Sequence, residues 1–319
     1  MVNAKLEKHP HAPLVHRPPH PGRGASVSVV AAALLLFAAA ACAPEDGERG
    51  RSPGVGAEEE QAERAAAEAG EGTEGGDRPV CLEGGPFVAD GPIPVDGGGA
   101  DPGRISGLRW ERHEGCERFV VDLETEPDRE APGGVGVEVL RGSGLIRVTA
   151  EGVREVDQDA TDATFDGPLA RAAYSAWAPD GRSTWVDLHL AEPAEASARV
   201  LGGPARVVID LRPGGGALPP TAVTGQRVVV LEPRPGEVSF PLDVEGYART
   251  FEANVVVRLE QDGREVEETF TTATAWADAW GHFELTLDDG PDGPFELHVG
   301  EYSARDGTWE GVTLDLVGR

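Results

Sequence analysis

The sequence predicts an all-β protein in which two β-sandwich domains follow a signal peptide and a disordered acidic linker. Apolar residues alternate with polar ones at a period of two, as half-buried strands require. Gly and Pro turn signals separate these runs, and no convincing helical pattern lies between them. Several short strands in this arrangement are typical of β-sandwiches. The clearest alternating runs are 119–123, 186–190, 207–211 and 255–259.

The first 41 residues have the pattern of an export signal. Basic residues precede an apolar run at 25–41 that ends in small residues. Cys42 follows directly, and this arrangement resembles the lipobox of bacterial lipoproteins, although Ala39 stands where that family usually has Leu. The resemblance implies an extracytoplasmic protein anchored to the cell membrane by a lipid on Cys42. The alternative is ordinary secretion, with Cys42 present by chance.

The charge of the chain excludes some classes of protein. Its 56 Asp and Glu residues outnumber its 28 Lys and Arg residues, for a formal net charge of −28. No net positive field exists to displace phosphate counterions, so nonspecific nucleic-acid binding is excluded. A single apolar run near the start also excludes an integral membrane protein with several spans. We therefore expect contact with the membrane through the lipid anchor only.

The chain has three Cys residues, an odd number for an exported protein. Lipidation of Cys42 leaves Cys81 and Cys116 free to form a disulfide in an oxidising compartment. Such a bond would tie the segment around Cys81 to the first folded domain. Two free thiols are the alternative.

Composition divides the chain into five parts. After the signal peptide at 1–41, residues 42–103 are rich in Ala, Glu, Gly and Pro and are expected to form a disordered tether. Within that part, Phe87 and Ile93 are candidate packing anchors. The first sandwich is predicted at 104–212 and the second at 227–319, with a Gly/Pro-rich linker at 213–226.

The C-terminal part resembles a known family. Four separated motifs carry the resemblance, at residues 232–237, 241–254, 281–284 and 303–307. Together they are similar to the Gmad-type immunoglobulin-like domain of bacterial spore-germination and related envelope proteins. The resemblance covers about 227–317 and implies a non-enzymatic immunoglobulin-like sandwich.

The first predicted sandwich resembles the AMIN-like domain. Residues 105–121 and the closing strand 205–211 carry this resemblance, which covers about 104–212. AMIN domains are β-sandwich modules that direct envelope proteins to peptidoglycan. The resemblance therefore implies attachment to the cell envelope, but it transfers no binding residue.

Aromatic and basic side chains are the candidate binding residues. Aromatic faces stack on sugar rings or anchor protein interfaces, and they also cover the ends of sandwich cores. Arg residues on strand faces, such as Arg206 and Arg258, hold carboxylates bidentately or neutralise neighbouring acids. The candidate stacking residues are Trp276, Trp280, Tyr174, Trp177 and Trp185.

No catalytic residue, metal ion or cofactor is predicted. His113 and Cys116 have metal-like spacing, but two ligands do not make a zinc site, and a disulfide would remove the thiolate. Residues 157–166 cluster acidic side chains without the central Gly and terminal Glu of an EF-hand loop. The Gly142-Ser-Gly144 sequence lacks the nucleophile-elbow pattern.

These observations favour a non-catalytic lipoprotein that acts as a binding or scaffolding module of the cell envelope. Its expected partner is peptidoglycan or an envelope protein. One alternative is a small-ligand or signal-sensing lipoprotein of a membrane complex, and a second is an unrecognised envelope hydrolase. The strong negative charge opposes binding to anionic wall polymers, so any glycan binding must be local and sensitive to salt.

Overall fold

The computed structural model describes residues 81, 85–126, 130–276 and 279–319, all within the compact unit Thr73–Arg319. Their regular structure is β-strand apart from the short 3-10 turns η1 (Arg141–Ser143), η2 (Gln158–Ala160) and η3 (Phe251–Ala253), which confirms the all-β fold. No helix in these ranges is long and apolar enough to cross a membrane. The expected signal peptide and Cys42 lie outside the described residues.

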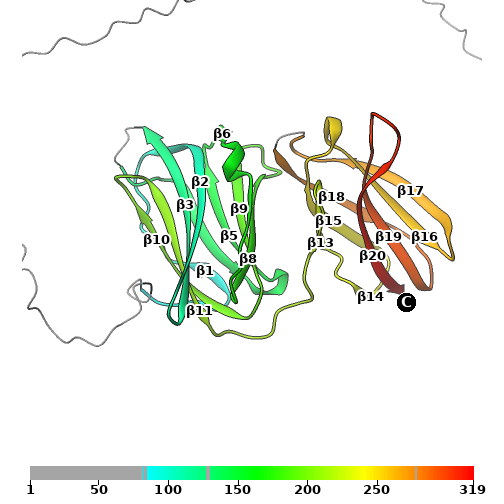
Figure 1. The fold of residues 1–319 in the computed structure, drawn as a ribbon, viewed down its shortest axis with the longest axis horizontal. Coiled ribbons are helices and arrows are strands. Elements are labelled where there is room, and N and C mark those ends of the chain that lie inside the picture. Colours follow the sequence, from blue (N-terminus) through cyan, green and yellow to red (C-terminus); the bar gives the residue numbers. More distant parts are fainter. Residues whose placement is uncertain (1–80, 82–84, 127–129, 277–278) are drawn as a thin grey trace, which may run out of the picture. The chain divides into compact units, whose positions relative to one another are not determined.

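The N-terminal sandwich consists of two layers of strands (Figure 1). Both layers are almost entirely antiparallel, and the short strand β6 pairs in parallel with β2. Across the first layer the order is β10 (Ala194–Leu201), β11 (Arg206–Pro213), β3 (Cys116–Glu126), β2 (Asp101–His113) and β6 (Glu155–Val156). Across the second it is β1 (Gly91–Ile93), β4 (Val135–Leu140), β5 (Leu145–Glu151), β9 (Ser183–Leu190) and β8 (Ala170–Trp177), with β7 (Asp162–Thr164) also paired to β8.

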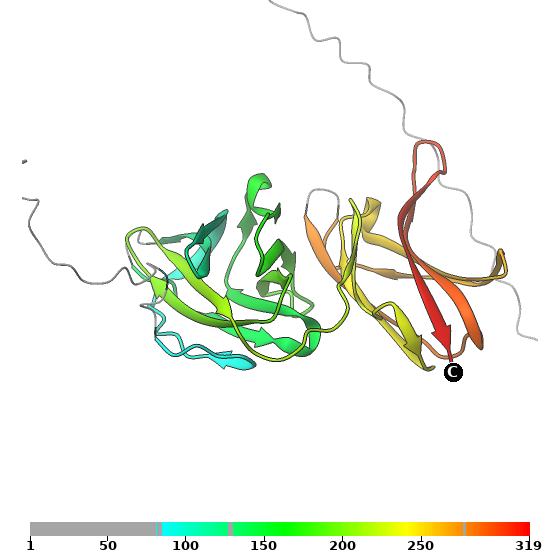
Figure 2. The ribbon, with the colours of Figure 1, turned by 60° about the horizontal axis from the view of Figure 1, so that its bottom comes forward.

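The C-terminal sandwich also has two layers, and its last strand ends at the C-terminus (Figure 2). One layer continues the second layer of the N-terminal sandwich. Its strands are β18 (Trp280–Leu287), β15 (Leu242–Ala248), β13 (Val228–Glu232) and β12 (Val223–Thr224). The other layer contains β14 (Gly236–Val238), β20 (Trp309–Gly318), β19 (Gly293–Tyr302), β16 (Asn254–Gln261) and β17 (Arg264–Thr272).

The period-two alternation places one face of each strand in a core, as predicted. In β3 the side chains of Phe119, Val121 and Leu123 are buried in the N-terminal core. In β16 those of Val255 and Val257 are buried in a separate C-terminal core. Because successive side chains of a strand point to opposite faces, the intervening residues lie on the outer surfaces of the sheets.

The strands extend beyond the expected domain boundaries. Residues 91–103, expected in the disordered tether, form β1 and the start of β2, and Ile93 is buried in the core. Val88 exchanges backbone hydrogen bonds with Ala196 of β10. The segment joins the sheets through backbone groups, which leave no alternating apolar pattern in the sequence, so its Gly/Pro-rich composition concealed it. Likewise, β12 lies within the expected linker.

The two sandwiches share one sheet. Strand β18 pairs in parallel with β8, where Trp280 lies opposite Ala176 and Gly281 opposite Trp177. A third apolar cluster covers this joint. It contains Leu145, Ala172, Tyr174, Ala176, Ala222, Val229, Leu231, Tyr247 and Trp280.

A buried polar network crosses the same joint. Arg147 of β5 forms a bidentate ion pair with Asp187 of β9, with distances of 2.9 Å from Nε to Oδ1 and 2.7 Å from Nη2 to Oδ2. Tyr247 of β15 donates its hydroxyl proton to Asp187. The Arg147 guanidinium stacks on Trp185, 3.6 Å from the ring centroid. Asp187 was expected on the polar face of its strand, and this face is buried because the C-terminal sandwich packs against it.

Burial and charge shift the pKa values of this network in consistent directions. Burial lowers the pKa of Arg147, but the hydrogen bond and negative charge of Asp187 outweigh burial, so its pKa is raised. Burial and the Asp187 charge together raise the pKa of Tyr247 well above its usual range. The guanidinium group of Arg147 is therefore charged and the phenol of Tyr247 neutral near neutral pH.

A disulfide joins Cys81 to Cys116, with Cα atoms 6.4 Å apart. Cys116 begins β3 at the β2–β3 hairpin, and both Cys residues are buried. The bond therefore ties the chain that precedes β1 to the first layer of the N-terminal sandwich.

We predict that replacing both Cys residues, Cys81→Ala with Cys116→Ala, lowers the free energy of unfolding. The bond closes a separation of 35 residues. On the chain-entropy model such a loop contributes about 3–4 kcal/mol. Chemical unfolding of the double variant and of the parent chain measures the difference, and reduction of the parent should reproduce it. A parent chain whose stability does not change on reduction would contradict this expectation.

We also predict that His189 makes stability depend on pH. Burial lowers its pKa from 6.5 to about 4, so the folded state keeps the ring neutral where the unfolded state takes up a proton. This contribution is complete above pH 6.5 and is lost as the pH falls toward 4. The expected loss is about 3 kcal/mol over that window.

Urea unfolding of the parent chain and of His189→Gln across this pH window measures the effect. The variant lacks the titrating ring, so its free energy of unfolding should fall less steeply than that of the parent. Parallel curves for the two proteins would rule out His189 as the source.

Candidate functional site

The outer face of the first layer carries a lattice of charged side chains. In β3, Arg118, Val120 and Asp122 point away from the core because Phe119 and Val121 point into it. Cross-strand pairing places Arg118 opposite Asp210, Val120 opposite Val208, and Asp122 opposite Arg206. The neighbouring strands β2 and β10 add Arg109 opposite Val120, and Arg199 opposite Val208.

These side chains line a groove of about 820 Å³. Its centre is apolar, with Val120, Val208 and Leu201, and charged side chains surround this centre. We call it the arginine groove. The charged residues that line it are Arg109, Arg118, Arg199, Arg206 and Glu111.

Buried and half-buried carboxylates hold the guanidinium groups in place. Asp210 is fully buried and accepts hydrogen bonds from Arg118, at 2.6 and 3.0 Å, and from Arg199, at 2.9 Å. Asp122 accepts two from Arg109, at 2.5 and 2.7 Å. The hydrogen bond to Asp122 raises the pKa of Arg109, so this group stays charged. The guanidinium groups of Arg109, Arg118 and Arg199 are therefore ordered before any ligand binds, whereas Arg206 donates a hydrogen bond to the backbone oxygen of Pro204.

The arginine groove differs in charge from the chain as a whole. Its four guanidinium groups outnumber the carboxylates of Glu111, Asp122 and Asp210, whereas the chain has a formal net charge of −28. Arg presents a planar fork of donors that suits carboxylates and phosphates. The groove can therefore hold an anionic group above an apolar floor.

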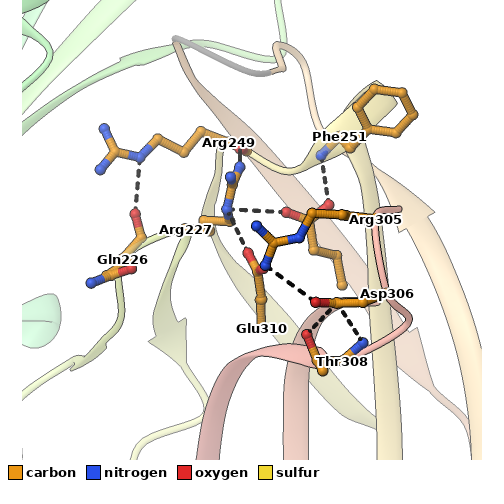
Figure 3. A network of polar contacts seen from close by, with 9 residues as sticks. Gln226, Arg227, Arg249, Phe251, Arg305, Asp306, Thr308 and Glu310 are labelled. Carbon is orange, nitrogen blue, oxygen red and sulfur yellow. Dashed lines mark hydrogen bonds and ion pairs between the residues drawn. The ribbon is translucent and has the colours of Figure 1, made fainter. Parts of the chain in front are cut away.

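A second cavity, of about 650 Å³, has balanced charge. Arg227 lies between the carboxylates of Glu301, at 3.4 Å, and Glu310, at 2.9 Å (Figure 3). The backbone N–H of Phe251 donates to Glu301 at 2.7 Å, and the Nε of Arg249 donates to the backbone oxygen of Gln226 at 2.9 Å. The Phe251 side chain is exposed beside this network.

Most of the candidate stacking residues are part of the packing. Trp280 and Tyr174 are buried in the cluster at the joint, so they cannot stack on a ligand. Trp185 lies against that cluster and under Arg147, and Trp177 packs on the N-terminal core. Trp276 is 56% exposed, with its ring centroid 6.3 Å from that of Phe251. Of the two roles open to these residues, packing describes Tyr174 and Trp280, which are covered where the two sandwiches meet.

The other candidate positions carry structural contacts. Cys116 is in the disulfide, and the His113 ring lies 3.5 Å from the Glu111 carboxylate. Within the acidic stretch 157–166, Asp157 pairs with Arg104, and Asp162 accepts hydrogen bonds from Arg249 and Trp280. These two carboxylates therefore serve the fold.

Arg206 is a candidate binding residue from the sequence alone, but its neighbours in the arginine groove are not. The alternation in β3 did contain a signal, since a core-facing Phe119 requires an outward-facing Arg118. That alternation does not reveal which strands lie beside β3. The order β10-β11-β3-β2 brings together residues that are distant in sequence, such as Arg109 and Arg206, which are 97 positions apart.

We predict that Asp210→Asn destabilises the fold. The substitution removes the buried charge that orders Arg118 and Arg199, and hydrogen bonds to charged groups contribute about 1.5–3 kcal/mol. We expect a loss of about 2 kcal/mol in the free energy of unfolding by urea titration. Asp306→Asn, at an exposed turn, is the matched control. A loss below about 0.5 kcal/mol, typical of surface substitutions, would contradict the structural role of Asp210.

Comparison with known proteins gives one match. The family model described as the immunoglobulin-like domain of bacterial spore germination, Gmad2, matches residues 227–308. No curated protein and no solved structure matches the chain. The matched range begins beside β13 and ends in the loop before β20, so it covers most of the C-terminal sandwich. Residues 227–308 are therefore similar to the Gmad2 immunoglobulin-like domain of bacterial spore germination.

Proposed function

We propose that this chain is a non-catalytic lipoprotein of the cell envelope that binds a carboxylate-bearing wall polymer, peptidoglycan, through the arginine groove. The observation that carries the proposal is a set of four guanidinium groups, three of them held by carboxylates, on the outer face of a sheet in a strongly acidic chain. In this view the lipid on Cys42 anchors the protein outside the cell membrane. Residues between Cys42 and the first strands act as the tether.

The chemistry of the groove suits this class of ligand. The peptide stems of peptidoglycan carry free carboxylates, and bidentate hydrogen bonds from Arg recognise carboxylates well. The apolar floor formed by Val120 and Val208 offers contact to aliphatic parts of the same stems. An acidic protein is expected to repel an anionic polymer. Salt screens this repulsion beyond about 8 Å at physiological ionic strength, so the positive charge of the groove can attract the polymer locally.

The N-terminal sandwich supports the proposal through its architecture. Its two layers enclose one core, as expected for the AMIN-like domain that residues 105–121 and 205–211 resemble. We propose that this sandwich is the wall-binding module. The C-terminal sandwich, which is similar to a domain of spore germination, then serves as a scaffold that contacts an envelope protein.

A second candidate function rests on the cavity around Arg227. Its guanidinium group and the carboxylates of Glu301 and Glu310 offer both charges within a few ångströms, beside the exposed Phe251 ring. Such a site suits a small zwitterion such as an amino acid. This observation favours the ligand-sensing role over the scaffolding role for the C-terminal sandwich.

Retention on purified peptidoglycan sacculi tests the wall-binding proposal. The chain from residue 43 onward contains every described residue and should be retained, with retention falling as salt rises. The double variant Arg199→Ala with Arg206→Ala removes two guanidinium groups and leaves the buried Arg118–Asp210 pair in place. We expect it to bind at least about tenfold more weakly, since each lost charge-assisted hydrogen bond costs about 1.5–3 kcal/mol.

The matched control is Arg305→Ala, which removes one exposed guanidinium group from the C-terminal sandwich. This variant should bind as the parent does. Equal loss of binding in the control and the double variant would show a nonspecific charge effect. No retention of the parent at any salt would contradict peptidoglycan as the ligand and turn the search to protein partners and small zwitterions.

A further inference from the structure

A row of carboxylates crosses the outer face of the five-stranded sheet of the C-terminal sandwich, which contains β14, β20, β19, β16 and β17. Strand pairing places Asp315 of β20 opposite Glu296 of β19, and Glu296 opposite Glu260 of β16. Glu260 in turn lies opposite Glu265 of β17. Like charges directly opposite each other on a sheet are destabilising, so a bound cation would stabilise this row.

The His298 side chain faces the middle of this row from β19. Its Nε2 lies 3.2 Å from Oε2 of Glu296 and 3.6 Å from Oε2 of Glu260. The residue is only 8% exposed, and its Nε2 atom is buried without forming a hydrogen bond. A buried ring nitrogen beside two carboxylates is an arrangement that a metal ion would satisfy.

The other ring nitrogen is held by a neighbouring strand. Nδ1 of His298 lies 2.9 Å from Oγ1 of Thr313, which stands opposite His298 in β20. Histidine residues that bind metal ions usually donate their second ring N–H to an oxygen, which fixes the tautomer and the ring orientation. Thr313 is positioned to accept that hydrogen bond and to leave the Nε2 lone pair directed at the carboxylates.

The distances suit a small divalent ion. The ligand atoms of Glu260, Glu296 and His298 all lie within 4.8 Å of one another. Zinc binds nitrogen and oxygen ligands at about 2.0–2.2 Å, which separates the ligand atoms of a tetrahedron by about 3.4 Å. The distances of 3.2 and 3.6 Å from Nε2 to the two carboxylates lie on either side of that value.

The nearby guanidinium group of Arg258 does not neutralise the carboxylate row. Arg258 lies 3.7 Å from Glu260, but it also stacks over Trp309, 5.3 Å from the ring centroid, and its Nη1 is 3.3 Å from the Tyr302 hydroxyl. One guanidinium group stands against a row of four carboxylates, so the row keeps a net negative charge.

We propose that Glu260, Glu296 and His298 bind a divalent transition-metal ion, for which zinc is the best fit, with Thr313 as a positioning residue. The ion links β16 to β19 and offsets part of the negative charge of the carboxylate row. Three protein ligands leave a fourth coordination position for water or for a side chain of a partner. This site is independent of the arginine groove and of the function proposed for it.

Isothermal titration with zinc, together with the visible absorption of bound cobalt, tests this proposal. The chain from residue 43 onward suits the experiment because it lacks His9, His11, His16 and His20, which would also bind zinc. We expect one zinc ion per chain and a cobalt spectrum of a four-coordinate site. Thr313→Val, at an exposed position, should weaken zinc affinity by about 10–100-fold.

His298→Gln should reduce the affinity by more than Thr313→Val does, at least about 100-fold. Glu268→Gln is the matched control, because Glu268 lies on the same sheet face and accepts a hydrogen bond from Tyr302 at 2.8 Å, away from the three ligands. The control should bind zinc as the parent does. Circular dichroism of each variant checks that it is folded.

Two results would overturn the proposal. One is a parent chain that binds no zinc, which would show that Glu260, Glu296 and His298 do not form a zinc site. The other is zinc binding that His298→Gln and Thr313→Val leave unchanged, which would place the ion elsewhere. Binding to sacculi does not enter either result, so this test and that of the arginine groove can fail separately.

Discussion

The buried ion pair between Arg147 and Asp187, completed by Tyr247, is the interaction on which the arrangement of the two sandwiches depends. Arg147 and Asp187 come from the N-terminal sandwich and Tyr247 from the C-terminal one, so the network closes only when both are in contact. Leaving a buried charge without its partner is strongly destabilising. The apolar cluster holds the two sandwiches together, and this network and the parallel pairing of β18 with β8 fix which residues meet at the joint.

A recurring device in this acidic chain is the pairing of carboxylates with Arg across neighbouring strands. Asp210 with Arg118, Asp122 with Arg109, and Asp187 with Arg147 all follow it. Bidentate geometry keeps each guanidinium group in place. In the arginine groove the fixed guanidinium groups present positive charge to a ligand. At the joint the guanidinium group of Arg147 pairs with the buried carboxylate of Asp187. In the carboxylate row, Glu260 lies opposite Glu296 instead of opposite an Arg residue, which is why the row suggests a metal ion.

The strands and their core-facing residues could be predicted from the sequence, but the candidate sites could be predicted only in part. The alternation in 119–123 and 255–259 identified the buried side chains correctly, because burial on one face of a strand leaves a period of two. It placed Asp187 on a polar strand face and left Trp280 and Tyr174 open between ligand stacking and core packing, because the surroundings of these residues include the other sandwich. It also missed Glu260, Glu296 and His298, because strand order and register bring them together.

The sequence by itself determined the all-β fold class, the two apolar cores and the resemblance of the C-terminal part to an immunoglobulin-like domain. These properties depend on local periodicity and on motifs, which are read along one stretch of chain. Only the tertiary structure decided which strands are neighbours, and thereby the arginine groove, the joint and the carboxylate row. Each of these combines side chains from strands distant in sequence, and no local pattern records strand order.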